Sequence, residues 1–448
     1  MTNRNSIEKS VYLFFFCFLG GGILPVSKPV YCSPAAGRAG RPPTVSEMTA
    51  YENQKALEAY QKRNSKITRS ADGVVASNQV NAALLYYQAL LLMPEPNQLI
   101  DAKLTDIHRG IEKPDNEVRA FLGKCLPGIK IFQTASLMPR CMLGVLPENQ
   151  MNLGSLTRKL FKLSFITLVD GQTLVTDGKY IVGLEQCLTV RRLARHLSED
   201  PHLYGSALDF DRVALSTARD ILGIIPPDSN TLVWFRNQLG EVAASRLSSS
   251  ADMVKRAATS VLSEMQTDSD GLALWKEQAV QEAEGEQAKE DVRNLTSGEF
   301  LSRAREGLEQ FTDSICRILY SEMSYVQKNA QVLTFIDESQ KAATTDPVVK
   351  AFTPLVSSRI RLQWRAGLAH TVRVRGLRAA VEVYLVLAKT GRLPEELPEH
   401  LPKDPFTGLD FEYEITDEGF ALRCQSGLTR REESRLRMRT ALEFKVRK

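Results

Sequence analysis

The sequence lacks every short motif that by itself defines an enzyme. It contains no G-x-S-x-G nucleophile elbow, no G-x-x-x-x-G-K-[ST] phosphate loop and no dinucleotide-binding glycine fingerprint. Histidine is scarce, with 5 in 448 residues, and none stands in a hydrolase motif. The sequence therefore predicts no cofactor and no catalytic residue. An unrecognised hydrolase or metal-dependent enzyme remains the alternative to a structural or protein-binding role.

Cysteine usage and net charge exclude two further classes. The 7 cysteines are widely spaced and form no C-x-x-C pair, and two of them fall near the N-terminus. The five that remain indicate neither a disulfide framework nor a zinc site. Cys125 and Cys141 are the nearest pair should one bridge form. A net charge of +4 is small for this length, so we expect no nucleic-acid partner.

An apolar run follows two basic residues at the N-terminus. Arg4 and Lys9 precede the apolar run, residues 11–26. This run is shorter than the roughly 20 apolar residues that a helix needs to cross a bilayer. Residues 1–35 are therefore predicted to be a signal peptide or an N-terminal anchor, and 36–47 a flexible linker rich in Pro, Gly and Ala. We expect an exported protein, periplasmic or associated with the cell envelope.

The rest of the chain has the spacing of amphipathic helices. The predicted fold class is mainly α: stacked antiparallel helices with a small C-terminal β-hairpin module. The expected helices are 49–66, 77–93, 117–124, 156–169, 179–197, 202–222, 297–340 and 354–389, with an irregular stretch from 125 to 147. The helix over 77–93 is so apolar that we expect it to be buried on most sides.

Composition divides the chain into segments. The expected order after the linker is a helical domain (48–263), an acidic helical segment or linker (264–296), a long-helix region (297–390), a β-hairpin module (391–425) and a basic tail (426–448). The hairpin is predicted from two alternating runs, 411–415 and 420–424, joined by Thr416-Asp417-Glu418-Gly419.

The C-terminal module resembles that of type II secretion major pseudopilins. The residues that carry the resemblance are a long helix, G-R-L-P at Gly391, L-P-K-D-P-F-T-G at 401–408, and the F-E-Y and G-F-A-L strands. The same layout closes a group of exported bacterial helical proteins of unknown function, which the chain also resembles in L-L-Y-Y-Q-A-L-L-L-M-P (84–94) and R-R-L-A-R-H-L (191–197). The resemblance implies a shared structural module and a secretion-system-associated role as an alternative. Pilin assembly needs a Gly-Phe junction before the apolar run, and the leader has none.

A calcium loop is the first of two weak ligand sites. Aligned on Gly271, the run Q-T-D-S-D-G-L-A-L-W-K-E places Asp268, Asp270 and Glu277 at positions 3, 5 and 12 of an EF-hand loop. Position 1 is Gln266, so the first carboxylate is missing. An interhelical turn in which Asp270 caps the next helix is the competing interpretation.

Histidines and carboxylates at one helix junction form the second site. His196 and His202 flank a proline turn, and the nearby acids are Glu199, Asp200, Asp209 and Asp211. Imidazole with carboxylate suits a transition metal or acid–base chemistry. The H-E-x-x-H spacing is absent, so solvation of the helix ends is the competing interpretation.

Two basic stretches indicate surfaces for anions. Six arginines between 359 and 378 have no acidic residue among them, and five more lie between 430 and 439. The acidic segment packed alongside, or an anionic surface, would neutralise the first set. We expect protein partners in the cell envelope, with membrane contact through an uncleaved leader or the basic tail. A solvated terminus is the competing interpretation for the tail.

Overall fold

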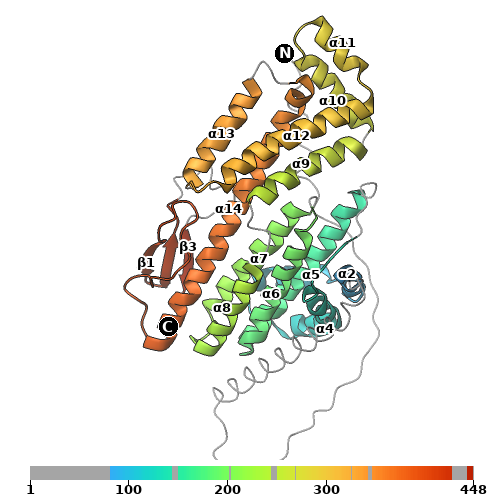
Figure 1. Cartoon of the computed structure of the whole chain (residues 1–448). Helices are drawn as coiled ribbons and strands as arrows, with labels where there is room; N and C mark the ends of the chain where they lie inside the picture. The colour runs from blue at the N-terminus through green and yellow to red at the C-terminus, as the bar shows by residue number, and fades with distance from the viewer. Residues whose placement is uncertain are drawn as a thin grey trace, which may run out of the picture.

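The computed structural model describes residues 81–143, 150–200, 203–243, 250–267, 269–323, 325–341, 346–425 and 441–446. Within them the chain forms thirteen α-helices and one three-stranded antiparallel sheet (Figure 1), which confirms the predicted mainly α class with β structure at the C-terminus. The first seven helices are α2 (Ala82–Leu91), α3 (Gln98–His108), α4 (Asn116–Ser136), α5 (Gln150–Thr176), α6 (Tyr180–Leu197), α7 (Tyr204–Leu222) and α8 (Ser229–Ala243). The others are α9 (Ser250–Thr267), α10 (Ser269–Glu282), α11 (Glu286–Asn294), α12 (Ser297–Tyr320), α13 (Tyr325–Lys341) and α14 (Pro347–Thr390). No described helix is long and apolar enough to cross a membrane.

Helix α14 packs against helices from both parts of the chain that precede it, α2–α8 and α9–α13. Its 44 residues contact α7 and α8 along one part of its length and α9, α10 and α12 along another (Figure 1). Asp346 caps its start, Pro347 occupies the first turn, and Gly391 ends it in the left-handed conformation, with φ 73°. Leu377, Val381 and Tyr384, which lie on one face of α14 at helical spacing, are buried.

Helices α5 to α7 pack side by side at close range. Gly171 of α5 and Gly183 of α6 allow the two backbones to approach. A Cβ at Gly183 would lie 2.7 Å from the carbonyl oxygen of Gly171. The predicted helix 179–197 matches α6 almost to the residue, because its leucines at helical spacing all face the core.

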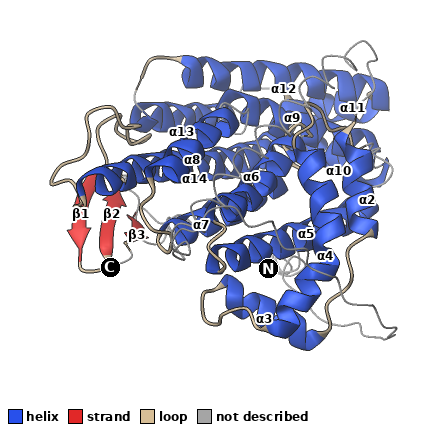
Figure 2. Ribbon diagram, turned by 90° about the horizontal axis from the view of Figure 1, so that it is seen from below, coloured by secondary structure: helices blue, strands red, loops and turns tan. Residues whose placement is uncertain are grey.

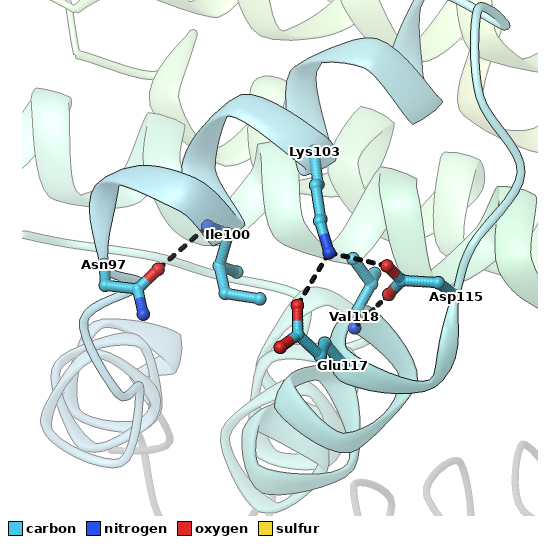
Figure 3. A network of polar contacts seen from close by, with 6 residues as sticks. All are labelled: Asn97, Ile100, Lys103, Asp115, Glu117 and Val118. Atoms are coloured by element: carbon cyan, nitrogen blue, oxygen red, sulfur yellow. Dashed lines mark hydrogen bonds and ion pairs between the residues drawn. The ribbon is translucent and has the colours of Figure 1, made fainter.

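Polar side chains cap the starts of α3 and α4 (Figure 3). Asn97 accepts a hydrogen bond from the Ile100 amide at the start of α3, and Asp115 accepts one from the Val118 amide at the start of α4. Between them Lys103 lies 2.6 Å from both Asp115 and Glu117. Short polar side chains at helix starts satisfy amides that have no partner inside the helix. Helix α3 is not among the helices predicted from the sequence.

Prolines and helix breaks account for most differences from the predicted helices. The expected end at residue 124 is wrong, because α4 continues through Pro127 to Ser136, and among the described residues the expected irregular stretch is confined to 137–143. Ile129 and Phe132 are fully buried there, and their burial offsets the roughly 3 kcal/mol that an interior proline costs. The expected helix over 297–340 is instead two helices, α12 and α13. Helix α14 begins at Pro347, seven residues before the predicted start.

Helix α2 is less buried than its composition predicted. It packs against α4, where Ala82, Tyr86 and Ala89 are buried. Leu84 and Leu91 on the opposite face are 72% and 86% exposed. The expectation of burial on most sides is therefore wrong, because only one face of α2 has neighbours among the described elements.

The sheet consists of β1 (Glu412–Thr416), β2 (Gly419–Arg423) and β3 (Ala441–Lys445), in that order. Strands β1 and β2 form the predicted hairpin. Strand β3 pairs with β2 in a register that places Phe444 opposite Phe420. The treatment of 426–448 as one tail is corrected by β3, since residues 441–445 complete the sheet. Figure 2 shows the sheet beside one end of α14, where the rings of Tyr384 and Phe420 lie 5.4 Å apart.

Candidate functional site

A buried ionic network joins α6, α7 and α14. The Nε atom of Arg191 donates to Oδ1 of Asp211 at 2.9 Å, and Nδ1 of His370 lies 3.0 Å from Oδ2 of the same carboxylate. The side chains of Arg191 and Asp211 are 1% and 0% exposed. Nη1 of Arg191 is buried without a hydrogen-bond partner. The consecutive helices α6 and α7 and the distant helix α14 are thus held to one carboxylate.

The charges in this network hold Asp211 ionised. Burial alone would raise the pKa of Asp211, since a carboxylate loses its hydration there. The positive charge of Arg191 and the contact with His370 outweigh burial and hold the pKa of Asp211 well below its ordinary value. Because a buried ion pair is held together only while both charges are present, the network has a structural role in fixing α7 against α6 and α14.

A pocket opens next to the network, between α7, α14 and β3. Its volume is about 260 Å³. Three of its lining residues are arginines: Arg212 and Arg219 on α7, and Arg373 on α14. Arg212 follows Asp211 directly, and Arg373 lies one helical turn beyond His370, so network and pocket share two helices. No histidine or carboxylate is among the residues that line the pocket.

Arg373 is charged at neutral pH, and the other two arginines of the pocket are ion-paired. Burial, and after it the positive charge of Arg212, lower the pKa of Arg373 to about 10, while Asp211 and Asp209 act in the opposite direction. Arg373 therefore remains charged at neutral pH. Arg212 binds Asp209 at 3.1 Å, and Arg219 binds its neighbour Asp220 at 2.9 Å.

The structure separates the residues of the predicted His–carboxylate site. His196 is 1% exposed, with Nδ1 2.8 Å from the Tyr86 hydroxyl and Nε2 2.9 Å from the Met138 carbonyl oxygen. Burial, with the charge of Arg195, lowers the pKa of His196 to about 4, so the ring is neutral at pH 7. Asp211 instead belongs to the Arg191 network, and His202 lies outside the described residues.

The remaining members of that predicted cluster lie in solvent-facing positions. Asp209 is exposed and pairs with Arg212, Glu199 is exposed, and Asp200 is half-buried. Within the described part of the chain, no three His, Cys, Asp or Glu side chains are placed to hold a metal ion. The described acids of the cluster therefore do not gather around His196.

The segment of the predicted calcium loop is largely helical. Helix α10 begins at Ser269, so Asp270 and Glu277 belong to one helix, and Glu277 is exposed. Asp268 lies outside the described residues. The open loop expected from 266 to 277 is thus replaced by helix from Ser269 onward, whereas an EF-hand wraps its ion in a non-helical loop. Calcium binding by Asp268, Asp270 and Glu277 stays a prediction.

The described cysteines are buried thiols. Cys125 and Cys141, the pair nearest in sequence, are both free. Burial raises the pKa of each to about 12, so neither thiol is ionised at neutral pH.

The arginines of the first basic stretch have separate environments. Arg361 pairs with Asp337 of α13 at 3.0 Å, and Arg375 donates to the carbonyl oxygen of Lys403. The acidic segment does pack alongside α14, through α9 and α10, where Lys350 lies 3.5 Å from Glu284. The arginines between 430 and 439 lie outside the described residues.

Sequence reasoning missed His370 and the arginines of α7. His370 stands in an apolar helix, A-G-L-A-H-T-V, and a lone histidine there gives no indication of its partner. On α7, Arg212, Ser216 and Arg219 share one face at helical spacing with Leu215. This pattern was a detectable signal for a basic helix face.

Comparisons of the chain with protein-family models, with curated proteins and with solved structures found no match. The resemblance to major pseudopilins stays a prediction.

Proposed function

We propose that the chain is an exported protein of the cell envelope with a structural or protein-binding role. Export rests on the charged and apolar character of residues 1–35, which lie outside the described residues. Protein binding rests on one structural observation, the exposed apolar face of α2. We define the α2 face as Leu84, Tyr87, Leu91 and Met142.

The α2 face is continuous along one side of the helix. Leu84, Tyr87 and Leu91 follow the i, i+3, i+7 spacing that places side chains on one helix face, and α2 has no charged residue. Residues 142 and 143 lie against the same side, because Asn81 donates to the carbonyl oxygen of Met142 at 2.7 Å and Tyr87 to that of Leu143 at 3.0 Å. Met142 is 75% exposed.

The size and neutrality of the face define the partner. Its four residues are between 39% and 86% exposed, and contiguous apolar patches on a monomer are often interaction sites. Since the helix offers no charge, electrostatic steering contributes little, and apolar contact must supply the affinity. The occupant that fits is an envelope protein presenting the apolar face of a helix.

Site-specific photocrosslinking in intact cells tests this proposal. A photoreactive residue at position 91 is expected to capture one defined envelope protein. Binding of that purified protein is then measured for the wild type and for Leu91→Asp, which should weaken it about tenfold or more. Leu274→Asp on α10 is the matched control, because Leu274 is 70% exposed on another helix, and it should bind like the wild type.

Two outcomes would overturn the proposal. Equal binding by Leu91→Asp and the wild type would remove the α2 face as the docking site, and crosslinks only to a second copy of the chain would make it a self-association face. Recovery of an intact Met1 from soluble cytoplasm would remove the envelope assignment. The hydrolase alternative is less well supported, because the pocket beside Asp211 is lined by arginines and apolar side chains.

A secretion-system-associated role is a narrower form of this proposal. The order of α14, the Gly391 stop and the β1–β2 hairpin supports it, since the pseudopilin-like module requires a long helix followed by antiparallel strands. Capture of a secretion component at position 91 would favour this role, and capture of an unrelated envelope protein would count against it.

A further inference from the structure

We propose that the pocket between α7, α14 and β3 binds a small amphiphilic anion, a carboxylate or phosphate group carrying a short apolar chain. This inference is independent of the α2 face. It rests on the charge of one part of the pocket lining, the apolar character of the other part, and the volume they enclose.

Three secondary-structure elements each turn one face to this pocket. The lining residues of α7 fall at i, i+3, i+4 and i+7, starting from Arg212. Those of α14 fall at i and i+4, starting from Arg373, and those of β3 at i and i+2, starting from Leu442. These are the spacings at which side chains share a side of a helix or strand. The pocket is therefore a regular feature of how β3 packs onto the two helices.

The arginines supply the anion-binding part. Arg212 and Arg373 both line the pocket, and burial, followed by the charge of Arg212, lowers the pKa of Arg373. Asp209 pairs with Arg212 and, with Asp211, offsets part of this repulsion between like charges, and an oxyanion between the two guanidinium groups would relieve the rest. Guanidinium groups bind carboxylate and phosphate through paired, charge-assisted hydrogen bonds, which strengthen as water is excluded.

The apolar part of the lining determines the rest of the ligand. Leu215, Leu377, Leu442 and Phe444 line the pocket together with the arginines, and each is at most 7% exposed. The apolar surface that they leave open to the pocket is therefore small, and a short hydrocarbon chain is enough to cover it, with the modest gain in free energy that burial of a small apolar area gives.

The enclosed volume limits the size of the ligand. A pocket of about 260 Å³ holds roughly a dozen non-hydrogen atoms at the packing density of protein interiors. An eight-carbon carboxylate or alkyl phosphate has this size. The pocket is smaller than most sites for drug-sized molecules, which begin near 300 Å³.

Calorimetric titration of the purified full chain tests the site. The probes are octanoate, octyl phosphate, octanol and inorganic phosphate. We expect saturable 1:1 binding of at least one of the two amphiphilic anions, about tenfold tighter than octanol or inorganic phosphate, and weakened by added salt. The tighter of octanoate and octyl phosphate identifies the natural ligand group as carboxylate or phosphate.

Two variants and a control locate the binding. Arg212→Gln should weaken the anion about tenfold by removing a charge-assisted contact. Ser216→Tyr should abolish binding by filling the pocket from its exposed rim. Arg236→Gln is the control, because Arg236 on α8 is also partly exposed and ion-paired but does not line the pocket. Octanol binding as tightly as octanoate, wild-type affinity in both pocket variants, or no saturation would each overturn the proposal. None of these results involves a protein partner, so they leave the α2 face untouched.

Discussion

The two halves of the molecule on either side of α14 place their charges differently. In the α2–α8 half, the side chains of the pair Arg191–Asp211 are 1% and 0% exposed, and those of Arg192–Glu185 are 7% and 5% exposed. In the α9–α13 half, the pair Arg293–Glu290 is 52% and 57% exposed. Buried charges need one specific arrangement of partners, whereas exposed charges are satisfied by water in many arrangements.

The difference in the burial of ion pairs indicates that polar contacts fix the helix packing in the α2–α8 half. In the α2–α8 half, α6 supplies Arg191 to α7, and Arg192 donates to Gln238 of α8 at 3.3 Å. A shift of α6 by one turn would leave these groups buried without partners. In the α9–α13 half, apolar contact fixes the packing, and the ion pairs lie on its surface.

The largest expected effect is that of Asp211→Asn. The substitution removes the negative charge that compensates Arg191, so we expect a loss of about 3–5 kcal/mol in the free energy of unfolding. Urea denaturation followed by circular dichroism measures it. Asp337→Asn is the matched control, because it removes one member of the pair Arg361–Asp337, whose side chains are 36% and 58% exposed, and should cost less than about 1 kcal/mol. Similar losses in both variants would break the comparison between the two halves.

The buried His196 of the α2–α8 half should make the stability of the protein depend on pH. Because the folded-state pKa of His196 is about 4 and the ordinary value is 6.5, the unfolded chain binds the proton more tightly. The contribution of the neutral His196 ring to the free energy of unfolding is fully present above pH 6.5. It is lost as pH falls toward 4, and the total loss is about 3 kcal/mol.

Comparison with His196→Gln isolates this contribution. Burial raises the pKa of Asp170 to about 6, which favours the folded state at acid pH and partly masks the histidine. The difference between wild type and variant cancels that opposing effect. The stability difference should shrink by about 3 kcal/mol between pH 7 and pH 4, and a difference independent of pH would contradict the burial of a neutral imidazole.

Alanine at two glycines should change stability in opposite directions. Gly183→Ala in α6 places a Cβ 2.7 Å from the Gly171 carbonyl oxygen, so α5 and α6 must separate, at about 1–3 kcal/mol. Gly298→Ala in α12 meets nothing within 4 Å and should stabilise by about 0.4–1 kcal/mol, through the lower entropy of the unfolded chain. Thermal unfolding of both variants checks the signs. A stabilising Gly183→Ala would show that the two helices are not in close contact.

Local patterns predicted the helices better than the site. Helix α6 was predicted because its leucines repeat at helical spacing, and α14 because a strong periodic face precedes a Gly391 stop. The contact between Asp211 and His370 depends on how α14 folds back onto α7, which no local pattern records. Strand β3 was missed because its short alternation, A-L-E-F-K, follows a basic run, and its pairing with β2 depends on a tertiary contact. At Pro127, local propensity predicted the end of a helix, but α4 continues because the residues that follow the proline are buried.

The smallest expected effect concerns the start of α12, in the half whose polar contacts are exposed. The Thr296 hydroxyl accepts a hydrogen bond from the Glu299 amide at 3.2 Å, and the Glu299 carboxylate accepts one from the Thr296 amide at 2.8 Å. Thr296→Ala removes the first bond and should cost about 1 kcal/mol, since it leaves a helix-end amide without its cap. Arg293→Gln, which breaks a neighbouring surface pair, should change stability by less than about 0.5 kcal/mol. Urea midpoints of the two variants decide the order. If Arg293→Gln proved the more costly, surface charge rather than helix capping would be the polar contribution that stabilises the α9–α13 half.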